Sequence, residues 1–337
     1  MHNHYAYIYN ELVWNVLKET VGVEEAVLFA RSARWARNSS RCTGAATATP
    51  TTNRWRKACA AGCPSACQGL ASGAMILADS RIPRRRMSTS VGAHSACFPA
   101  TAACTVANPT GFRGAYDDES CDVVRFFTEQ KCRMMPYLYR EAARANEAGT
   151  PMMRAMMLEF PDDPACDYLD RQYMLGDAVM VAPVFSEAGD VEFYLPEGRW
   201  THLWRNDEVQ GSRWHKQQHD FLSLPVYVRD NTLLALGNNS QKPDYAWHEG
   251  TAFQLFHLDD GCEAVCEVPA TDGSTIFTLQ AKRTGNTITV SGEGEARNWT
   301  LCLRNITQIS GTKCGSYAGS ELGVVVTPQG NEVVITL

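Results

Sequence analysis

The sequence predicts a mixed α/β region followed by an all-β region, and three observations carry this prediction. Residues 5–18 place apolar side chains at helical spacing, and residues 26–30 form a short apolar run typical of a buried parallel strand. Beyond Pro151 the apolar period changes to two, which is typical of β-strands. With 337 residues, the chain has enough length for roughly two or three domains.

Two helices are expected before Pro151. The first covers residues 5–18, and Gly22 is placed to end it, because glycine adopts the left-handed conformation of a helix C-cap. The second begins at Asp117 or Asp118 and continues to Gly149, with apolar residues on one face.

Three consecutive acids, Asp117, Asp118 and Glu119, allow two interpretations. They could be paired catalytic carboxylates, or they could cap a helix whose first turn favours negative charge. Capping is the favoured interpretation, since the acids stand immediately before the helical pattern.

Composition and charge exclude several classes of protein. The net charge of −6 and the isoelectric point near 5.8 argue against a nucleic-acid binder that uses the whole chain. No apolar run reaches the ~18 residues of a membrane span, and no signal peptide is recognised at the start. Thirteen cysteines without such a signal favour reduced thiols in the cytoplasm.

Residues 34–114 differ from the rest of the chain. They hold ten arginines and one lysine but a single acid, Asp79, which gives a net charge of +10. An even distribution of acids would place roughly nine in such a span. The stretch also holds six of the thirteen cysteines and shows no sustained helical or strand period. It is therefore expected to be disordered.

Three interpretations of this stretch compete. A basic nucleic-acid-binding arm would be richer in lysine or aromatic residues. A metal site at Cys59, Cys63 and Cys67 lacks the spacing of known zinc or iron–sulfur sites. The favoured interpretation is GC-rich DNA read in the wrong frame. Suitable codons for residues 71–87, read in a shifted frame, encode Phe-Trp-Ser-His-Asp-Ile-Gly-Gly-Phe-Glu-Asn, and residues 41–47 encode Val-His-Trp-Gly-Gly-Asp.

Strand patterns begin beyond Pro151. Turn residues at 161–164 and 197–198 separate four predicted strands: Met152–Phe160, Ala178–Val184, Val191–Leu195 and Leu224–Val228. A polar connection at 238–244 follows. The remainder alternates cleanly, with a hairpin signal at Gly285 and Asn286, and predicts a small antiparallel sandwich.

Aromatic and imidazole side chains of this region are candidates for binding by residue type alone. A role in the core or in strand pairing is favoured over sugar stacking for Trp200, Trp204 and Trp214. No metal-like repeat, and hence no ligand role, is assigned to His202, His215 and His219.

Everything outside residues 34–114 resembles glycoside hydrolase family 31, and most closely its bacterial α-xylosidase branch. The segments that carry the resemblance are Met1–Arg31, Ala115–Phe160, Tyr173–Phe185 (YMLGDAVMVAPVF) and Tyr194–Trp204 (YLPEGRWTHLW). Both shifted-frame strings are also motifs of this family, and the family has a stretch of about the same length at this place. Two compensating frameshifts therefore explain the stretch better than an insertion does.

The resemblance implies the C-terminal remnant of a (β/α)8 barrel followed by two β-sandwich domains. Residues 1–33 would supply a barrel helix and strand, and residues 115–150 the last barrel helix. The proximal sandwich would cover residues 151–240 and the distal sandwich residues 241–337.

The implied activity is hydrolysis of terminal α-xylosidic or α-glucosidic bonds by a retaining mechanism, which needs two carboxylates. The family's nucleophile motif, Lys-x-Asp-Phe-Gly-Glu, does not occur in this sequence. The codon of the acid/base would straddle Ala46 and Thr47, and a substrate-binding His-Asp pair would fall within residues 75–77. The chain is therefore expected to have no catalytic residue of its own and to be inactive alone.

One residue of the family's substrate site is retained. Arg31 matches the arginine that hydrogen-bonds the sugar in the −1 subsite, although an ordinary ion pair at a strand end is the alternative. No metal and no cofactor are expected. The expected partner is an α-xyloside or α-glucoside, and neither nucleic acid nor a membrane is expected to bind. A homo-oligomer is compatible with the intact enzyme. The alternative functions are a non-catalytic carbohydrate-binding or assembly module and a basic nucleic-acid-binding segment.

Overall fold

The computed structural model describes residues 2–22, 74–79, 101–105, 118–148, 150, 152–186 and 188–337. These residues fall into two compact units. Unit 1 comprises Met1–Thr128, Glu141–Pro196 and Arg213–Pro225. Unit 2 comprises Glu129–Arg140, Glu197–Ser212 and Val226–Leu337.

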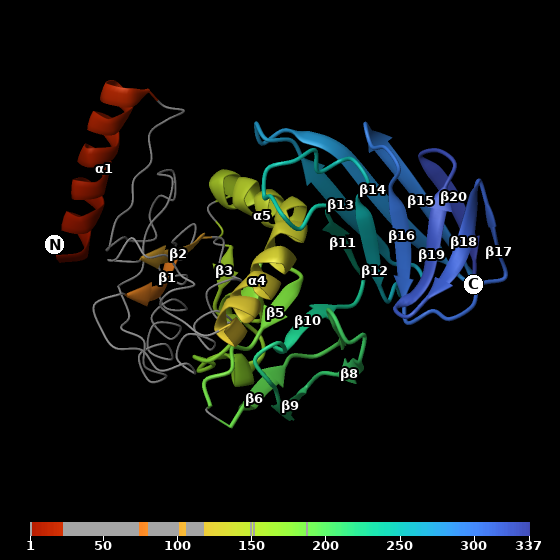
Figure 1. Ribbon diagram of the computed structural model, residues 1–337, viewed down its shortest axis with the longest axis horizontal. Helices are drawn as coiled ribbons and strands as arrows, with labels where there is room; N and C mark the ends of the chain where they lie inside the picture. Colours follow the sequence, from red (N-terminus) through yellow and green to blue (C-terminus); the bar gives the residue numbers. More distant parts are fainter. Residues whose placement is uncertain are drawn as a thin grey trace. The chain divides into compact units, whose positions relative to one another are not determined.

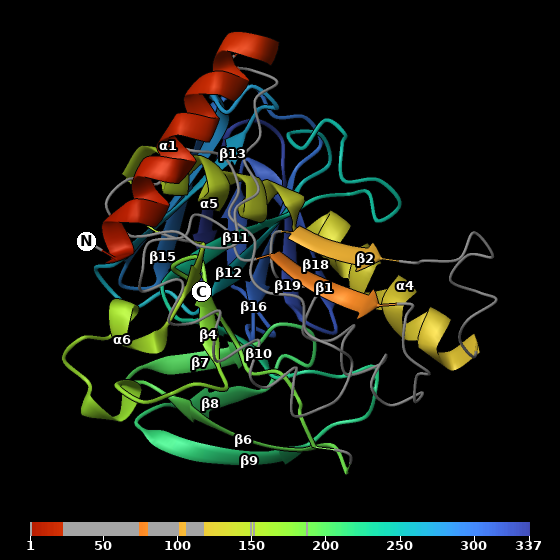
Figure 2. The same ribbon diagram turned by 90° about the vertical axis from the view of Figure 1, so that its left-hand side faces the viewer.

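Unit 1 contains short strands and helices. Its helices are α1 (His2–Val21), the start of α4 (Asp118–Arg133), most of α5 (Met135–Ala148), α6 (Met156–Glu159) and the 3-10 turn η2 (Pro164–Cys166). Its strands are β1 (Ala74–Asp79), β2 (Thr101–Thr105), β3 (Met153–Arg154), β4 (Tyr173–Leu175), β5 (Val179–Val181), β6 (Asp190–Leu195) and β9 (Arg213–Gln218). β1 pairs with β2 in parallel, β3, β4 and β5 pair antiparallel in that order, and β6 pairs antiparallel with β9 (Figure 2).

The first expected helix is confirmed by α1. Gly22 follows it with φ of +87°, and its N–H donates to the carbonyl of Lys18 at 3.1 Å. This is the left-handed end for which glycine is suited.

The second expected helix is two helices, so the prediction of one continuous helix to Gly149 is wrong. α4 ends at Arg133 and α5 begins at Met135, and both are coloured yellow in Figure 1. Pro136 is the cause, because it has no N–H and its ring collides with the carbonyl of residue 132 in a continuous helix. That carbonyl, of Cys132, instead accepts a hydrogen bond from the Tyr245 hydroxyl at 2.9 Å.

The predicted strand Met152–Phe160 is also wrong over most of its length. β3 covers only Met153–Arg154, and α6 follows, with the Phe160 N–H donating to the Met156 carbonyl at 2.9 Å. The Met-Met-Leu-Glu sequence of α6 consists of strong helix formers, which overrides the apolar run. The other three predicted strands are found as β5, β6 and β10 (Val226–Arg229).

Unit 2 is built around a sandwich of two five-stranded sheets, drawn in blue shades in Figure 1. One sheet has the order β11-β12-β16-β19-β18: β11 (Thr232–Leu236), β12 (Ala252–Phe256), β16 (Thr300–Arg304), β19 (Gly323–Pro328) and β18 (Gly315–Ser320). The other has the order β13-β14-β15-β20-β17: β13 (Glu263–Pro269), β14 (Thr275–Thr284), β15 (Thr287–Gly294), β20 (Glu332–Thr336) and β17 (Gly311–Lys313). β7 (Arg199–His202) pairs antiparallel with β8 (Glu208–Gln210) and with β10 in the same unit.

The sandwich differs from the expected all-antiparallel one at a single pair of strands among those described. β12 and β16 run parallel, with Ala252 opposite Thr300 and Leu255 opposite Leu303. The chain leaves β12, forms the β13–β14–β15 meander in the facing sheet and returns in the same direction. The predicted hairpin at Gly285 and Asn286 is confirmed, since these residues join β14 to β15.

The sandwich core explains why the strands alternate. Phe253 of β12, Phe277 of β14 and Trp299 pack with ring centroids 5.8–6.1 Å apart, and all three are at most 3% exposed. The ring of Tyr139 of α5 packs against Trp247 in a tilted arrangement with centroids 4.8 Å apart, and the Tyr139 hydroxyl donates to the Thr271 carbonyl at 2.6 Å. Replacing a buried phenylalanine of this kind by alanine lowers the free energy of unfolding by about 3–5 kcal/mol.

Among the helices that the structure describes, none combines the length and the apolar character needed to traverse a lipid bilayer.

Candidate functional site

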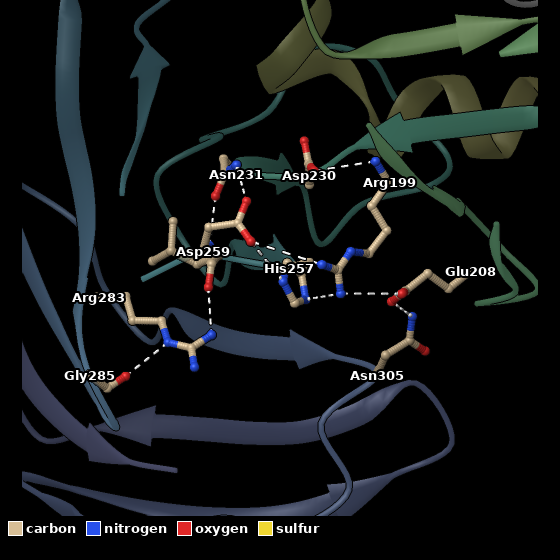
Figure 3. Close-up of polar contacts among 10 residues, drawn as sticks. Arg199, Glu208, Asp230, Asn231, His257, Asp259, Arg283, Gly285 and Asn305 are labelled. Carbon is tan, nitrogen blue, oxygen red and sulfur yellow. Dashed lines mark hydrogen bonds and ion pairs between the residues drawn. The ribbon is translucent and has the colours of Figure 1, made fainter. Parts of the chain in front are cut away.

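A group of polar side chains from separate strands meets in unit 2 (Figure 3). Arg199 begins β7 and is opposite Gln210 of the antiparallel β8, so Glu208, two residues before Gln210, faces Arg199 diagonally across the strand pair. His257 follows β12, Arg283 lies near the end of β14, and Asn305 follows β16. The β7–β8 pair and the strand ends of the sandwich therefore bring these five residues together although they are far apart in the sequence.

Arg199, His257 and Asp259 form a continuous row of polar contacts. The Arg199 Nη1 lies 3.2 Å from His257 Nδ1, and His257 Nε2 lies 3.2 Å from Asp259 Oδ1. A guanidinium has no acceptor, so Nδ1 accepts and Nε2 carries the hydrogen that is donated to Asp259. Arg199 Nη1 is also 3.5 Å from a Glu208 oxygen, while its Nη2 is 3.9 Å from Asp259.

Asp259 is held by its neighbour Asn231 in a reciprocal pair. The Asn231 amide donates to Asp259 Oδ2 at 2.9 Å, and the Asp259 N–H donates back to Asn231 Oδ1 at 2.8 Å. Asn231 has φ of +52°, a conformation that asparagine tolerates better than most residues. The Asn231 hydrogen bond, aided by His257 and Arg199, lowers the pKa of the Asp259 carboxyl below its ordinary value.

Arg283 joins the same segment from the facing sheet. Its Nη1 donates to the Leu258 carbonyl at 2.8 Å, and its Nε donates to the Gly285 carbonyl at 3.0 Å. The Gly285 N–H in turn donates to Asp260 Oδ1 at 2.6 Å. Arg199 and Arg283 thus both contact residues 257–259, as Figure 3 shows.

Arg304, at the end of β16, is 3% exposed and is bound by neutral acceptors. It donates to Asn206 Oδ1 at 2.7 Å, to Gln254 Oε1 at 3.3 Å and to the carbonyls of His202 and Leu203 at 3.3 and 3.0 Å. Its guanidinium also lies 4.9 Å from the ring centre of Phe256. Burial lowers the pKa of Arg304 to about 10, which leaves it charged at neutral pH.

A cavity of about 370 Å³ opens among these residues. Its charged and polar lining consists of Arg199, Glu208, His257, Arg283, Arg304 and Asn305. Its apolar lining consists of Leu255, Leu258, Ile288, Leu303, Ile306 and Leu337. Such a volume, with an apolar wall and a few convergent polar groups, is typical of a small-molecule site.

Most of the candidate residues from the sequence fall outside the described part of the chain. Arg31 lies outside the described residues, as do Ala46, Thr47 and Asp117. Asp118 and Glu119 stand exposed in the first turn of α4, in keeping with the helix-start interpretation. Within the part of the chain that the structure describes, no three His, Cys, Asp or Glu side chains form a group that could hold a metal ion.

Two of the three tryptophans have the roles that the sequence favoured, Trp200 in the core and Trp214 in a strand pair. Trp200 is 1% exposed, and Trp214 pairs across β6 and β9 with Tyr194, with ring centroids 5.7 Å apart. Trp204 lies 6.0 Å from the ring of His202. None of the three lines the cavity.

The three histidines named from the sequence occupy separate positions. His202 is buried and its Nδ1 accepts from the backbone N–H groups of Trp204 and Arg205. His215 stacks on Phe193 at 5.6 Å, and His219 contacts Ser223 and Gln217 through its two ring nitrogens. The histidine of the cavity, His257, was not singled out by any local pattern, since its partners come from distant strands.

Two family models match consecutive parts of the chain. Residues 149–234 match the glycosyl hydrolase family 31 C-terminal domain, and residues 246–337 match the C-terminal domain of alpha-xylosidase YicI. The chain therefore belongs to glycoside hydrolase family 31. Its relatives place it on an α-xylosidase-like branch of that family.

Two curated α-xylosidases illustrate this relationship. Alpha-xylosidase XylQ of Lactiplantibacillus pentosus is 30% identical over 272 residues, which is 77% of this chain and 35% of the relative. An alpha-xylosidase of Emericella nidulans is 37% identical over 137 residues, or 38% of this chain and 18% of the relative. The chain thus spans about a third or less of these relatives' length.

Solved structures show the same fold. A family 31 dextranase of Flavobacterium johnsoniae complexed with glucose superposes with a TM-score of 0.81 at 17% identity, covering 100% of this chain and 49% of that one. The α-xylosidase of Xanthomonas citri gives a TM-score of 0.67 at 16% identity, covering 79% and 32%.

Proposed function

We propose that this chain is the C-terminal portion of an α-xylosidase-type retaining glycosidase, and that by itself it does not hydrolyse glycosides. The observation that carries the proposal is the succession of two family 31 C-terminal domains, the second of them matching an α-xylosidase. The alignment with XylQ, which spans only 35% of that enzyme, supports the view that most of the catalytic barrel lies outside this sequence.

The absence of activity follows from the retaining mechanism, which needs two carboxylates about 5–5.5 Å apart. The given sequence contains neither the nucleophile motif nor the Trp-Gly-Gly-Asp motif of the acid/base. In this proposal residues 34–114 are a frameshifted stretch, and Arg31 is the one substrate contact that remains.

The domain organisation of the intact enzyme follows the family. Residues 1–33 and 115–150 belong to the barrel, residues 151–240 to a proximal sandwich and residues 241–337 to a distal sandwich; the matches at 149–234 and 246–337 support the last two. The substrate is a terminal α-xyloside, with an α-glucoside as the second choice, because relatives named as α-glucosidases also match. The thirteen cysteines support a reducing location, the cytoplasm.

The decisive experiment combines an assay with resequencing. The purified chain is incubated with p-nitrophenyl α-xyloside, and release of p-nitrophenol is expected to equal the buffer control. Turnover above that control would contradict the proposed inactivity.

The gene is then resequenced across the codons for residues 30–118 and several hundred bases upstream. Single-base changes near Arg34 and Gly114, with an in-frame nucleophile motif upstream, are expected to restore hydrolysis of the xyloside. If the restored protein hydrolyses p-nitrophenyl α-glucoside but not the xyloside, the α-xylosidase assignment is wrong and the α-glucosidase alternative takes its place.

A further inference from the structure

The cavity of unit 2 has an excess of positive charge. Three arginines line it, namely Arg199, Arg283 and Arg304, against one lining carboxylate, Glu208, and a second carboxylate, Asp259, beside Arg199. Among the described residues, no carboxylate oxygen lies within 4.0 Å of a guanidinium nitrogen of Arg283 or Arg304. A cation that is removed from water without a carboxylate favours the binding of an anion from solution.

The arginines keep donors that the protein does not use. Arg283 directs Nε and Nη1 to the Gly285 and Leu258 carbonyls, so its Nη2 has no recorded protein partner among the described residues. Arg199 Nη2 lies 3.9 Å from Asp259 Oδ1, which is too long for a hydrogen bond. Arg199 Nε is buried and also has no partner among these residues, which adds to the positive potential.

Neutral and acidic groups at the same cavity can bind hydroxyls. Glu208 accepts from the Asn305 amide at 3.4 Å, a long contact that leaves room for closer donors. Glu208 oxygens accept hydrogen bonds, and the Asn305 amide both donates and accepts. Leu255, Ile288 and Leu303 supply an apolar wall for a carbon framework.

We propose that this cavity binds a small monosaccharide that carries an oxyanion, a phosphate or a carboxylate. The oxyanion lies between Arg199 and Arg283, the hydroxyls contact Glu208 and Asn305, and the ring packs on the apolar wall. The cavity volume of about 370 Å³ accommodates a ligand of this size. The proposal does not rest on the glycosidase activity, because every residue it uses lies in the two C-terminal family domains.

The test is titration of the full chain by calorimetry with four probes: glucose 6-phosphate, glucuronate, inorganic phosphate and glucose. We expect binding of glucose 6-phosphate or glucuronate with a dissociation constant below about 1 mM. Glucose and inorganic phosphate should bind at least about tenfold more weakly, since each offers only part of the contacts. The two sugar acids distinguish a phosphate from a carboxylate site.

Two variants and one matched control locate the site. Arg283→Gln removes a lining charge, and Asn305→Asp adds a negative charge at an exposed position where φ of +61° is tolerated by both residues. Each should weaken binding at least about tenfold. Lys282→Gln removes the same charge from the adjacent, exposed position of β14, which points to the opposite face, and should change affinity less than about twofold.

Several outcomes would overturn the proposal. No heat with any probe at about 10 mM excludes a site of this kind. If inorganic phosphate binds as tightly as glucose 6-phosphate, the cavity holds an adventitious ion only. If glucose binds as tightly as glucose 6-phosphate, the arginines do not select an anion. Equal weakening by Lys282→Gln and Arg283→Gln means a general charge effect. If the Arg283→Gln variant does not fold, the Asn305→Asp variant provides the test. An Asn305→Asp variant that binds the sugar acid as tightly as wild type refutes the site.

Discussion

Two buried arginines, one in each unit, are stabilised in opposite ways. In unit 1, Arg154 is 9% exposed and contacts two carboxylates, Glu159 at 2.8 Å and the fully buried Glu141 at 3.2 Å. In unit 2, Arg304 is 3% exposed and its recorded partners are amide and carbonyl oxygens. The first arginine is neutralised within the protein, whereas the second keeps its charge beside a cavity. Burial alone therefore does not distinguish a structural arginine from one that can serve a ligand; its partners do.

The largest effect is expected when the carboxylate-bound arginine loses a partner. Glu141→Gln removes a carboxylate that contacts the buried Arg154 guanidinium, and should lower the free energy of unfolding by about 3 kcal/mol. Urea unfolding followed by tryptophan fluorescence measures this loss. Glu147→Gln, at an exposed position of the same helix, is the control. Equal small losses in the two variants would mean that Arg154 does not depend on Glu141.

A smaller loss is expected for the other arginine. Arg304→Leu leaves the acceptors of Asn206, Gln254 and two carbonyls without their donor, but it also removes the cost of burying a charge. We expect a net loss of about 2 kcal/mol in the same urea experiment, against no more than about 0.5 kcal/mol for the exposed Arg297→Leu. If Arg304→Leu lowers the free energy of unfolding by more than Glu141→Gln does, Arg304 contributes more to stability than the Arg154–Glu141 pair, which contradicts this expectation.

The cavity region should also show its own dependence on pH. The folded pKa of Asp259 lies below the ordinary value of an aspartate, so its stabilising contribution is present above that ordinary value and is lost as the pH falls through the folded pKa. Wild type should therefore lose more stability than Asp259→Asn between about pH 5 and pH 3. Because the carboxyl is partly exposed, the difference should stay below about 1 kcal/mol.

Parallel acid titrations of the two proteins, read as urea midpoints at each pH, check this expectation. Asp244→Asn, on the exposed connection between β11 and β12, should follow wild type. An identical pH profile for wild type and Asp259→Asn would show that the carboxylate contributes nothing to folding.

The smallest effect is expected for an arginine whose own side chain is exposed to water. Arg144 contacts Asp177 at 2.7 Å and Glu141 at 3.4 Å, but its side chain is 45% exposed. Arg144→Gln should therefore cost about 0.5 kcal/mol or less, because solvent screens the pair. Thermal unfolding at low and high salt measures it, and the difference from wild type should shrink as salt is added. A loss comparable with that of Glu141→Gln would mean that burial is not what separates these pairs.

Local sequence patterns predicted those parts of the fold that depend on neighbouring residues. The alternation in β14 and the Gly285–Asn286 turn are short-range signals, and both were found. The helix of residues 118–149 was misjudged because a proline at position 136 outweighs the apolar period on both sides of it. The strand predicted at Met152–Phe160 failed because an apolar run does not by itself distinguish strand from helix.

The candidate site was not accessible to the same reasoning. Its contacts join Arg199 to His257 and Asn231 to Asp259, pairs that only the folded strands bring together. Each residue, taken alone, looks like an ordinary polar residue at a strand end. Sequence did give the family, because long motifs such as residues 173–185 identify it without any knowledge of contacts.

The parallel pairing of β12 with β16 affects how the protein is made. Pairing with β11 satisfies one edge of β12, but the other edge waits until β13, β14, β15 and finally β16 have left the ribosome. At roughly 5–20 residues per second, that edge stays open for seconds. An open strand edge is a template for another chain. The order of translation, as well as the final stability of the sandwich, thus sets how many chains aggregate before they fold.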